Sequence, residues 1–145
     1  MLDKKEFAVI RKKLEDYDLY RENLIKKSRD ILTVSKQLIY ALHRNDLKQA
    51  DFLFDKAKSE KGKLDKIAKK QKKLSCEGSF SEANQEFAEA ISYYNFIKHG
   101  KLPKLKGLSV DYEDYLSGLC DLTGELTRRS VILASKKEMK KFEEI

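Results

Sequence analysis

The sequence is poor in cysteine, proline and glycine. Its 145 residues include two cysteines, one proline and six glycines. Cys76 and Cys120 are far apart and have no second ligand pair nearby, so we expect reduced thiols rather than a disulfide framework or a CxxC zinc or redox site. The chain shows neither an apolar signal-peptide core nor the roughly 18 consecutive apolar residues that a membrane-spanning helix needs. We therefore predict a cytoplasmic protein that does not enter a membrane.

Several motifs of catalysis and metal binding are also missing. The sequence contains no GxxxxGK[ST] phosphate loop, no HExxH zinc motif and no Ser-His-Asp arrangement. A ferritin-like di-iron site requires Glu-x-x-His on two helices, and neither His43 nor His99 has a glutamate three residues before it. We expect His43 at the end of a helix and His99 in a loop, and neither as a metal ligand.

Charge is abundant and unevenly distributed. Residues 1–75 carry 21 lysines and arginines against 12 acidic residues, a net charge of +9, whereas residues 76–145 carry 10 against 12, a net charge of −2. A strongly basic half favours binding to a polyanion, nucleic acid first, because its cations replace condensed counterions on phosphates. The alternative is a basic surface that is only solvated.

Apolar residues recur every three or four positions, and no segment alternates as a strand does, so we predict an all-α fold. The pattern over residues 7–42 predicts one long first helix, which Asn45 ends or Asp46 separates from the next. Gly78 interrupts the second helix, and Ser79 with Glu82 forms a capping box for the third. The expected architecture is a single domain over 1–145, an antiparallel helical bundle with basic helices over about 3–74 (the second one over about 47–74) and carboxylate-bearing helices over about 79–98 and 109–136, continuing helically to residue 145.

Two of these helices repeat one arrangement of carboxylates. Glu86 and Glu89 are three residues apart and Asp121 and Glu125 are four apart, so each pair lies on one helix face. Residues 80–97 hold three glutamates without lysine or arginine, and residues 107–127 hold five acidic residues without either. A structural role is the alternative for each carboxylate; Glu125, for example, can pair with an arginine one turn later.

If the third and fourth helices pack antiparallel, their four carboxylates can converge on a space lined by apolar residues. Such a cluster is costly to bury without a partner, and Mg²⁺ or Mn²⁺ with oxygen ligands offsets that cost. A metal held there can activate water or stabilise charge on a phosphodiester. We interpret the lack of lysine over residues 80–97 as keeping this site free of a competing cation.

Three segments carry a resemblance to a known family. They are YRENLIKKSRDILTVSKQLIYALHR at 20–44, QEFAEAISYYNFIKHGKLP at 85–103 and DYEDYLSGLCDLTGELTRRSV at 111–131. Together they resemble translin and translin-associated factor X, in the archaeal form. The resemblance implies an all-helical subunit in a closed hollow homo-oligomer, typically an octamer, that takes RNA inside, with a translin-type partner subunit as a further possibility. Relatives usually continue with more helices, so we expect either a fragment or a shortened form.

The chain is similar to the factor X branch, which carries an acidic, Mg²⁺-dependent endoribonuclease site. The resemblance assigns this site to Glu86 and Glu89 in an E-x-x-E pair and to Asp121 and Glu125 in DLTGE. It also implies that basic residues of the first helix hold the nucleic acid; the matching positions are Arg21, Lys26, Lys27 and Arg29. We therefore expect a nuclease that cleaves single-stranded RNA. The alternatives are a non-catalytic binder of single-stranded RNA or DNA and a helical scaffold protein.

Overall fold

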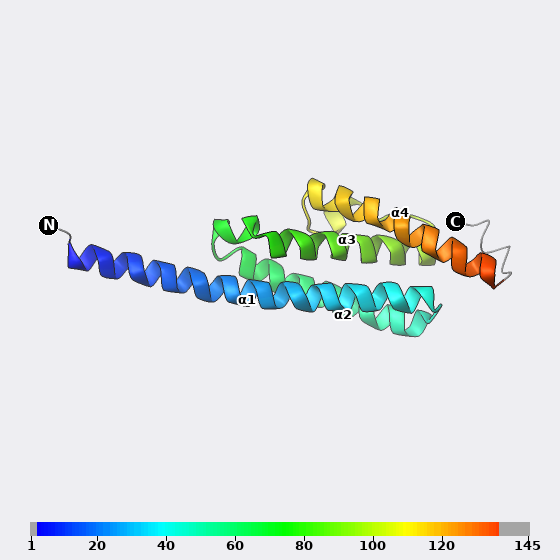
Figure 1. The fold of residues 1–145 in the computed structure, drawn as a ribbon, viewed down its shortest axis with the longest axis horizontal. Helices are drawn as coiled ribbons and strands as arrows, with labels where there is room; N and C mark the ends of the chain where they lie inside the picture. Colours follow the sequence, from blue (N-terminus) through cyan, green and yellow to red (C-terminus); the bar gives the residue numbers. More distant parts are fainter. Residues whose placement is uncertain (1–2, 137–145) are drawn as a thin grey trace.

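The computed structural model describes residues 3–136, which form four α-helices (Figure 1). These are α1 (Lys4–His43), α2 (Leu47–Ala68), α3 (Gly78–His99) and α4 (Tyr112–Ser135), with short 3₁₀ helices η1 (Lys72–Cys76) and η2 (Leu105–Gly107). The predicted all-α class and the long first helix are confirmed, and the described part of the chain contains no strand. None of the described helices is both long and apolar enough to cross a bilayer. The helix predicted for 137–145 lies outside the described residues.

The break between the first two helices occurs where the sequence predicts it. Asn45 adopts a left-handed backbone with φ of 58°, which stops α1 and which asparagine tolerates better than most residues. Asp46 is the N-cap of α2, and its carboxylate accepts a hydrogen bond of 3.1 Å from the backbone N–H of Gln49. The short turn makes α1 and α2 an antiparallel hairpin.

The start of α3 differs from the prediction. The N-cap is Glu77 and makes no side-chain capping bond, so the predicted capping box of Ser79 and Glu82 is wrong. The Ser79 hydroxyl is instead buried without a hydrogen-bond partner. The carboxylate of Glu77 is used across the bundle, where it accepts hydrogen bonds from Tyr17 (2.6 Å) and Arg21 (2.9 Å) of α1. Tertiary contacts thus replace the local cap.

The second helix is shorter than predicted, because α2 ends at Ala68 rather than near Leu74. Gln71 then adopts an extended backbone, and the chain forms η1. This turn directs Leu74 into the core, where its side chain is fully buried. The fully buried large side chains that hold the helices together include Leu24, Ile31, Leu38, Leu42, Leu64, Leu74 and Tyr93.

The fourth helix runs parallel to the third, so the antiparallel packing expected for this pair is wrong. Asp114, near the start of α4, contacts Asn84 near the start of α3, and Gly118 lies against Gln85 and Glu89 further along. The reason is the long return of the chain along the bundle between the two helices (Figure 1). The Tyr115 hydroxyl donates to the carbonyl of Pro103 at 2.8 Å, which holds this return segment in place.

A glycine sets the distance between these parallel helices. A Cβ atom added at Gly118 would lie 2.6 Å from the carbonyl oxygen of Gln85 and 2.8 Å from the backbone nitrogen of Glu89. No side chain fits there, so the backbones of α3 and α4 approach closely at this level. Carboxylates that follow Gly118 on α4 are thereby brought beside Glu89.

Candidate metal centre and nucleic-acid interface

Glu89 is the most enclosed of the four predicted carboxylates. It lies near the middle of α3, and only 7% of its surface is exposed. Burial, together with the negative charges of Glu86, Glu125 and Asp121, raises the pKa of Glu89 to about 7, and Lys36 acts against them. Among the described residues, no group donates a hydrogen bond to this carboxylate. Glu89 is therefore a buried acid with negative neighbours and no bound donor.

The other three carboxylates are less buried than Glu89. Glu86 and Glu125 are partly buried, and Asp121 is exposed. Burial also raises the pKa of Glu86, against the lowering effect of Lys36. The structure thus brings the predicted residues of α3 and α4 into one electrostatic environment, and it does so through parallel helices.

Helix α1 supplies a lysine to this environment. The ammonium nitrogen of Lys36 lies 3.5 Å from a carboxylate oxygen of Glu86, and the lysine side chain is 56% exposed. The expectation that the site is free of a competing cation is therefore wrong, although α3 itself contributes none. Lys36 of α1 places a positive charge beside Glu86, although residues 80–97 of α3 contain no lysine or arginine.

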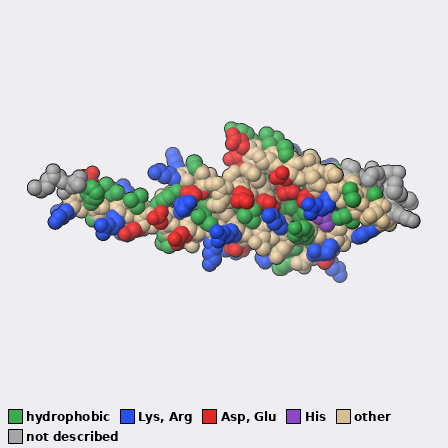
Figure 2. Space-filling view, in the orientation of Figure 1, with side chains coloured by type: hydrophobic (Ala, Val, Ile, Leu, Met, Phe, Trp, Pro, Cys, Tyr) green, Lys and Arg blue, Asp and Glu red, His purple; other side chains and the backbone are tan. Residues whose placement is uncertain are grey.

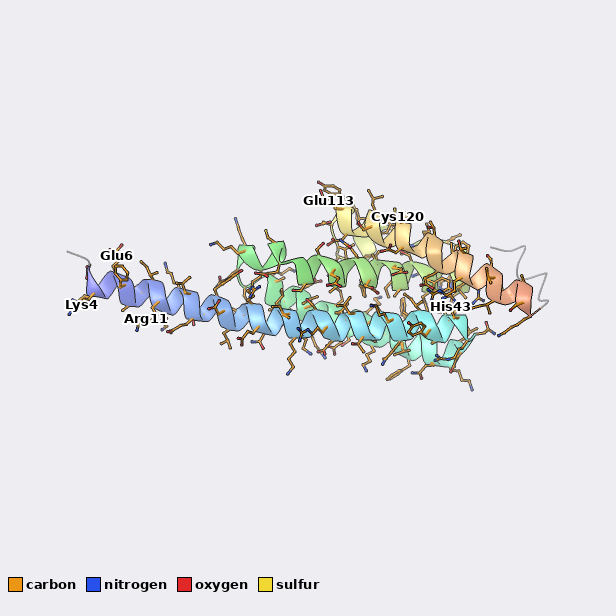
Figure 3. All side chains as sticks on the ribbon, viewed as in Figure 1. Lys4, Glu6, Arg11, His43, Glu113 and Cys120 are labelled. Atoms are coloured by element: carbon orange, nitrogen blue, oxygen red, sulfur yellow. The ribbon has the colours of Figure 1, made fainter. Side chains whose placement is uncertain are left out.

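The second contact from α1 comes from His43, one heptad after Lys36. Its Nε2 atom lies 2.5 Å from Oε2 of Glu125, and its Nδ1 atom lies 3.2 Å from the hydroxyl of Tyr93. Figure 3 labels His43 at the end of α1, beside α3 and α4. The prediction of His43 at a helix end is confirmed, but sequence analysis missed its contact with Glu125. The seven-residue spacing from Lys36 was the available signal.

Arginines of α4 complete this end of the site. Arg128 lies 3.6 Å from the same oxygen of Glu125, an ion pair that the sequence offered as the structural alternative for this carboxylate. Arg129 is buried and donates a 2.9 Å hydrogen bond to the carbonyl of Leu42 near the C-terminus of α1. Arg129 therefore fastens α4 to α1 next to His43. In Figure 2, acidic side chains lie along the middle of this face, with a histidine at one end of the group.

The donor chemistry of the site fits a hard divalent cation, although the carboxylates are not gathered around one point. In the described part of the chain, no three Asp, Glu, His or Cys side chains are placed to hold a metal ion. The fit rests on Glu89, a buried carboxylate without a donor, because such a group gains from a cation. Coordination would also require Glu86 and Glu125 to turn from Lys36 and His43.

The four predicted nucleic-acid ligands of α1 divide into two groups. Arg21 is bound to Glu77, and Lys27 lies 2.8 Å from Asp30 and 3.2 Å from Glu60 of α2. Lys26 and Arg29 are exposed, and neither forms a salt bridge with any described residue. Lys26 and Arg29 thus offer free cations, whereas Arg21 and Lys27 already serve contacts within the subunit.

A second buried carboxylate between α3 and α4 escaped sequence analysis. Asp114 is 3% exposed and accepts hydrogen bonds from Ser81 (2.5 Å), Asn84 (3.0 Å) and Gln85 (3.1 Å). The backbone N–H of Asp114 in turn donates to the N-cap Asp111. This cluster is fully occupied by protein donors, so it ties the start of α4 to the start of α3.

A model of the translin family matches residues 19–145 of this chain. An uncharacterized protein of Methanocaldococcus jannaschii is 36% identical over an alignment covering 86% of this chain and 55% of that protein. The translin-associated protein X homolog of Schizosaccharomyces pombe is 30% identical, covering 90% of this chain and 63% of the relative. The chain thus spans little more than half the length of these two relatives.

Solved structures with the same fold are similar over almost the whole chain. A crystal structure of AfC3PO superimposes with a TM-score of 0.86 at 26% identity, covering 96% of this chain and 72% of that one. A structure of an AfC3PO complex with duplex RNA gives a TM-score of 0.83 at 26% identity, with coverage of 96% and 71%.

Proposed function

The chain belongs to the translin family, and from that premise we propose that it is a metal-dependent endoribonuclease whose site is formed by the four carboxylates on α3 and α4. The observation that carries the proposal is Glu89. A glutamate that is 7% exposed, near three other acids and without a protein donor among the described residues, is stabilised by a proton or by a cation. Carboxylates whose pKa is strongly raised by burial and by neighbouring charges cluster at functional sites.

In the proposed site, Glu86, Glu89, Asp121 and Glu125 would hold Mg²⁺ or Mn²⁺. The ion would supply a Lewis acid for the phosphodiester and an activated water. The protein side chains then have distinct tasks. Glu89 anchors the site in the interior, and the exposed Asp121 forms its solvent side. His43, itself in contact with Tyr93, orients Glu125.

We propose RNA as the ligand because both the charge of the chain and its relatives favour it. The first 75 residues carry a net charge of +9, and Lys26 and Arg29 present free cations on the outer face of α1. A similar structure contains duplex RNA, and two similar proteins carry the name translin-associated protein X. For cleavage we propose single-stranded RNA, within a homo-oligomer of the octameric family type or with a translin-type partner subunit.

One observation favours a second function, a non-catalytic binder of single-stranded RNA or DNA. Lys36 and His43 already contact Glu86 and Glu125, so the carboxylates have cationic or hydrogen-bonding partners without a metal. In that case α3 and α4 supply only structure, and the basic half of the chain does the work. The two functions differ in whether a divalent metal ion leads to cleavage of the RNA or affects only the affinity of the protein for RNA.

The test is cleavage of labelled single-stranded RNA by the purified chain, with duplex RNA and single-stranded DNA in parallel. We expect cleavage in Mg²⁺ or Mn²⁺, none in EDTA, and a loss of at least about 100-fold in Glu125→Ala, since a metal site contributes several kcal/mol to the transition state. Glu113→Ala is the matched control, because Glu113 is an exposed acid of the same helix.

Each outcome distinguishes the functions. Intact RNA that binds with a steep salt dependence would support the non-catalytic binder, because each phosphate contact adds to the slope of log affinity against log salt. Cleavage that survives Glu125→Ala in a folded variant would place the reaction elsewhere on the protein. Absence of both cleavage and salt-dependent binding would leave a helical scaffold.

A further inference from the structure

A pocket of about 410 Å³ lies between the C-terminal end of α2, η1, the first turn of α3 and the return segment between α3 and α4. Asp65 and Lys69 line it at the end of α2, Lys72 lines it from η1, Phe80 from α3 and Ser109 from the return segment. Sites for one small organic molecule have volumes of about 300–1,000 Å³, so the pocket has a suitable size. It shares no residue with the four carboxylates of the proposed metal site.

The buried ammonium group of Lys61 holds one wall of this pocket in place. Lys61 is 3% exposed, and its Nζ atom donates hydrogen bonds to the carboxylate of Asp65 and, at 2.9 Å, to the carbonyl of Ser109. The same nitrogen lies 5.7 Å from the centroid of the Phe80 ring. Ser109 has a φ of 55°, which residues other than glycine rarely adopt. Lys61 therefore positions three of the residues that line the pocket.

The pocket carries a net positive charge. Lys69 and Lys72 are exposed, and neither forms a salt bridge with any described residue. Asp65 is the only acid among the described lining residues, and Lys61 already binds it. Three lysines against one carboxylate give a net charge of +2. Burial lowers the pKa of Lys61, so an anion in the pocket would favour the charged form of this lysine. The charge therefore favours a ligand with two negative charges.

An aromatic ring and a hydroxyl group add to the lysines. Phe80 is partly buried and lines the pocket, so it offers a surface on which a planar base can stack. The Ser75 hydroxyl also lines the pocket and donates to the carbonyl of Lys72 at 2.7 Å, which leaves its oxygen free to accept a hydrogen bond. Cations, an aromatic ring and an acceptor suit the phosphate, the base and the ribose of a nucleotide.

We propose that this pocket binds a free nucleoside monophosphate, with the phosphate paired to Lys69 and Lys72 and the base on Phe80. A phosphate group of this kind carries about two negative charges at neutral pH, which matches the charge of the pocket. The inference goes beyond the proposed function and does not depend on it. A chain without nuclease activity would still bind the nucleotide, and a nuclease could lack this site.

The first test is equilibrium dialysis of the full chain against labelled AMP, with adenosine and inorganic phosphate in parallel. EDTA in the buffer keeps metal out of the carboxylate site, so that site cannot hold the phosphate. We expect saturable binding of AMP and at least about tenfold weaker binding of adenosine and of phosphate, because each lacks one of the two recognised groups. No saturable binding of AMP would refute the proposal, and equal affinity for phosphate would refute the recognition of a base.

The second test locates the bound nucleotide in the wild-type chain. Lys69, Lys70, Lys72 and Lys73 are all exposed, but only Lys69 and Lys72 line the pocket. We expect AMP to slow the acetylation of Lys69 and Lys72, measured by mass spectrometry, and to leave Lys70 and Lys73 unchanged. Equal protection of the four lysines would indicate attraction to a basic surface and would contradict a site in the pocket. Protection by 5′-phosphorylated RNA but not by AMP would assign the pocket to the end of a strand instead.

Matched double variants complete the experiment. Lys69→Met with Lys72→Met removes the two pocket cations, and Lys70→Met with Lys73→Met removes the same charge from the same segment. We expect the first pair to weaken AMP binding at least about tenfold and the second pair to change it less than about twofold. Phe80→Leu keeps an apolar side chain and should weaken AMP more than phosphate. Equal losses in the two double variants would overturn the assignment, and circular dichroism checks that each variant is folded.

Discussion

Two buried carboxylates between α3 and α4 have opposite surroundings. Asp114 accepts three side-chain hydrogen bonds from α3, whereas Glu89 has three acids around it and no donor among the described residues. Both lie on the same helix interface, one on each side of the close approach at Gly118. Burial alone therefore does not distinguish a structural acid from a functional one. The supply of donors does, because an acid with donors is satisfied and an acid without them needs a proton or a cation.

The largest effect is expected from Asp114→Ala. The substitution removes the common acceptor of the Ser81, Asn84 and Gln85 donors. A buried donor left without an acceptor lowers the stability of a fold by about 1–3 kcal/mol when no water replaces the acceptor. We expect a loss of about 3 kcal/mol in the free energy of unfolding, measured by urea denaturation. Glu113→Ala, one residue earlier and exposed, should change it by less than about 1 kcal/mol. Equal losses in both variants would contradict the structural role of Asp114.

The second prediction concerns Glu89→Gln, which should raise the free energy of unfolding rather than lower it. The pKa of Glu89 is raised from 4.5 to about 7, so its contribution to stability is complete below pH 4.5 and is lost as the pH rises through 7. Between a pH below 4.5 and a pH above 7, this shift lowers the free energy of unfolding by roughly 3 kcal/mol. In metal-free buffer we expect Glu89→Gln to remove this pH dependence and to stabilise the fold by about 2 kcal/mol at pH 8.

The measurement is urea denaturation of wild type and variant at pH values from 4.5 to 8, compared as a difference so that other carboxylates cancel. Glu82→Gln, an exposed position on the same helix, is the control. If the difference between Glu89→Gln and wild type were independent of pH, the raised pKa would be wrong.

The smallest effect should come from Lys36→Met. The lysine lies 3.5 Å from Glu86 and is 56% exposed, so it competes with a metal for that carboxylate only weakly. We expect Lys36→Met to tighten Mn²⁺ binding by up to about fivefold, measured from the electron paramagnetic resonance signal of free Mn²⁺. Lys26→Met, another exposed lysine of α1, should leave Mn²⁺ affinity unchanged. Weaker Mn²⁺ binding in Lys36→Met would show that the lysine supports the site rather than competing with the metal.

Local spacing in the sequence was enough to predict the helices and the pairing of carboxylates on each of them. The break at Asn45 and Asp46 and the presence of Glu86 with Glu89 on one helix face depend only on backbone geometry within a few residues. The end of α2 and the start of α3 could not be predicted in this way. At both places contacts with distant residues, through Leu74 and Glu77, override the local signals.

What the tertiary structure alone decided is which partners meet each carboxylate. The return of the chain between α3 and α4 makes these helices parallel, and α1 brings Lys36 and His43 to acids 50 and 82 residues further along the chain. It also decided that Asp114 accepts hydrogen bonds from three side chains of α3, whereas Glu89 accepts none from the described residues. The physical reason is that burial and hydrogen-bond supply are properties of the packed interface, whereas a sequence determines directly only which residues share a helix face.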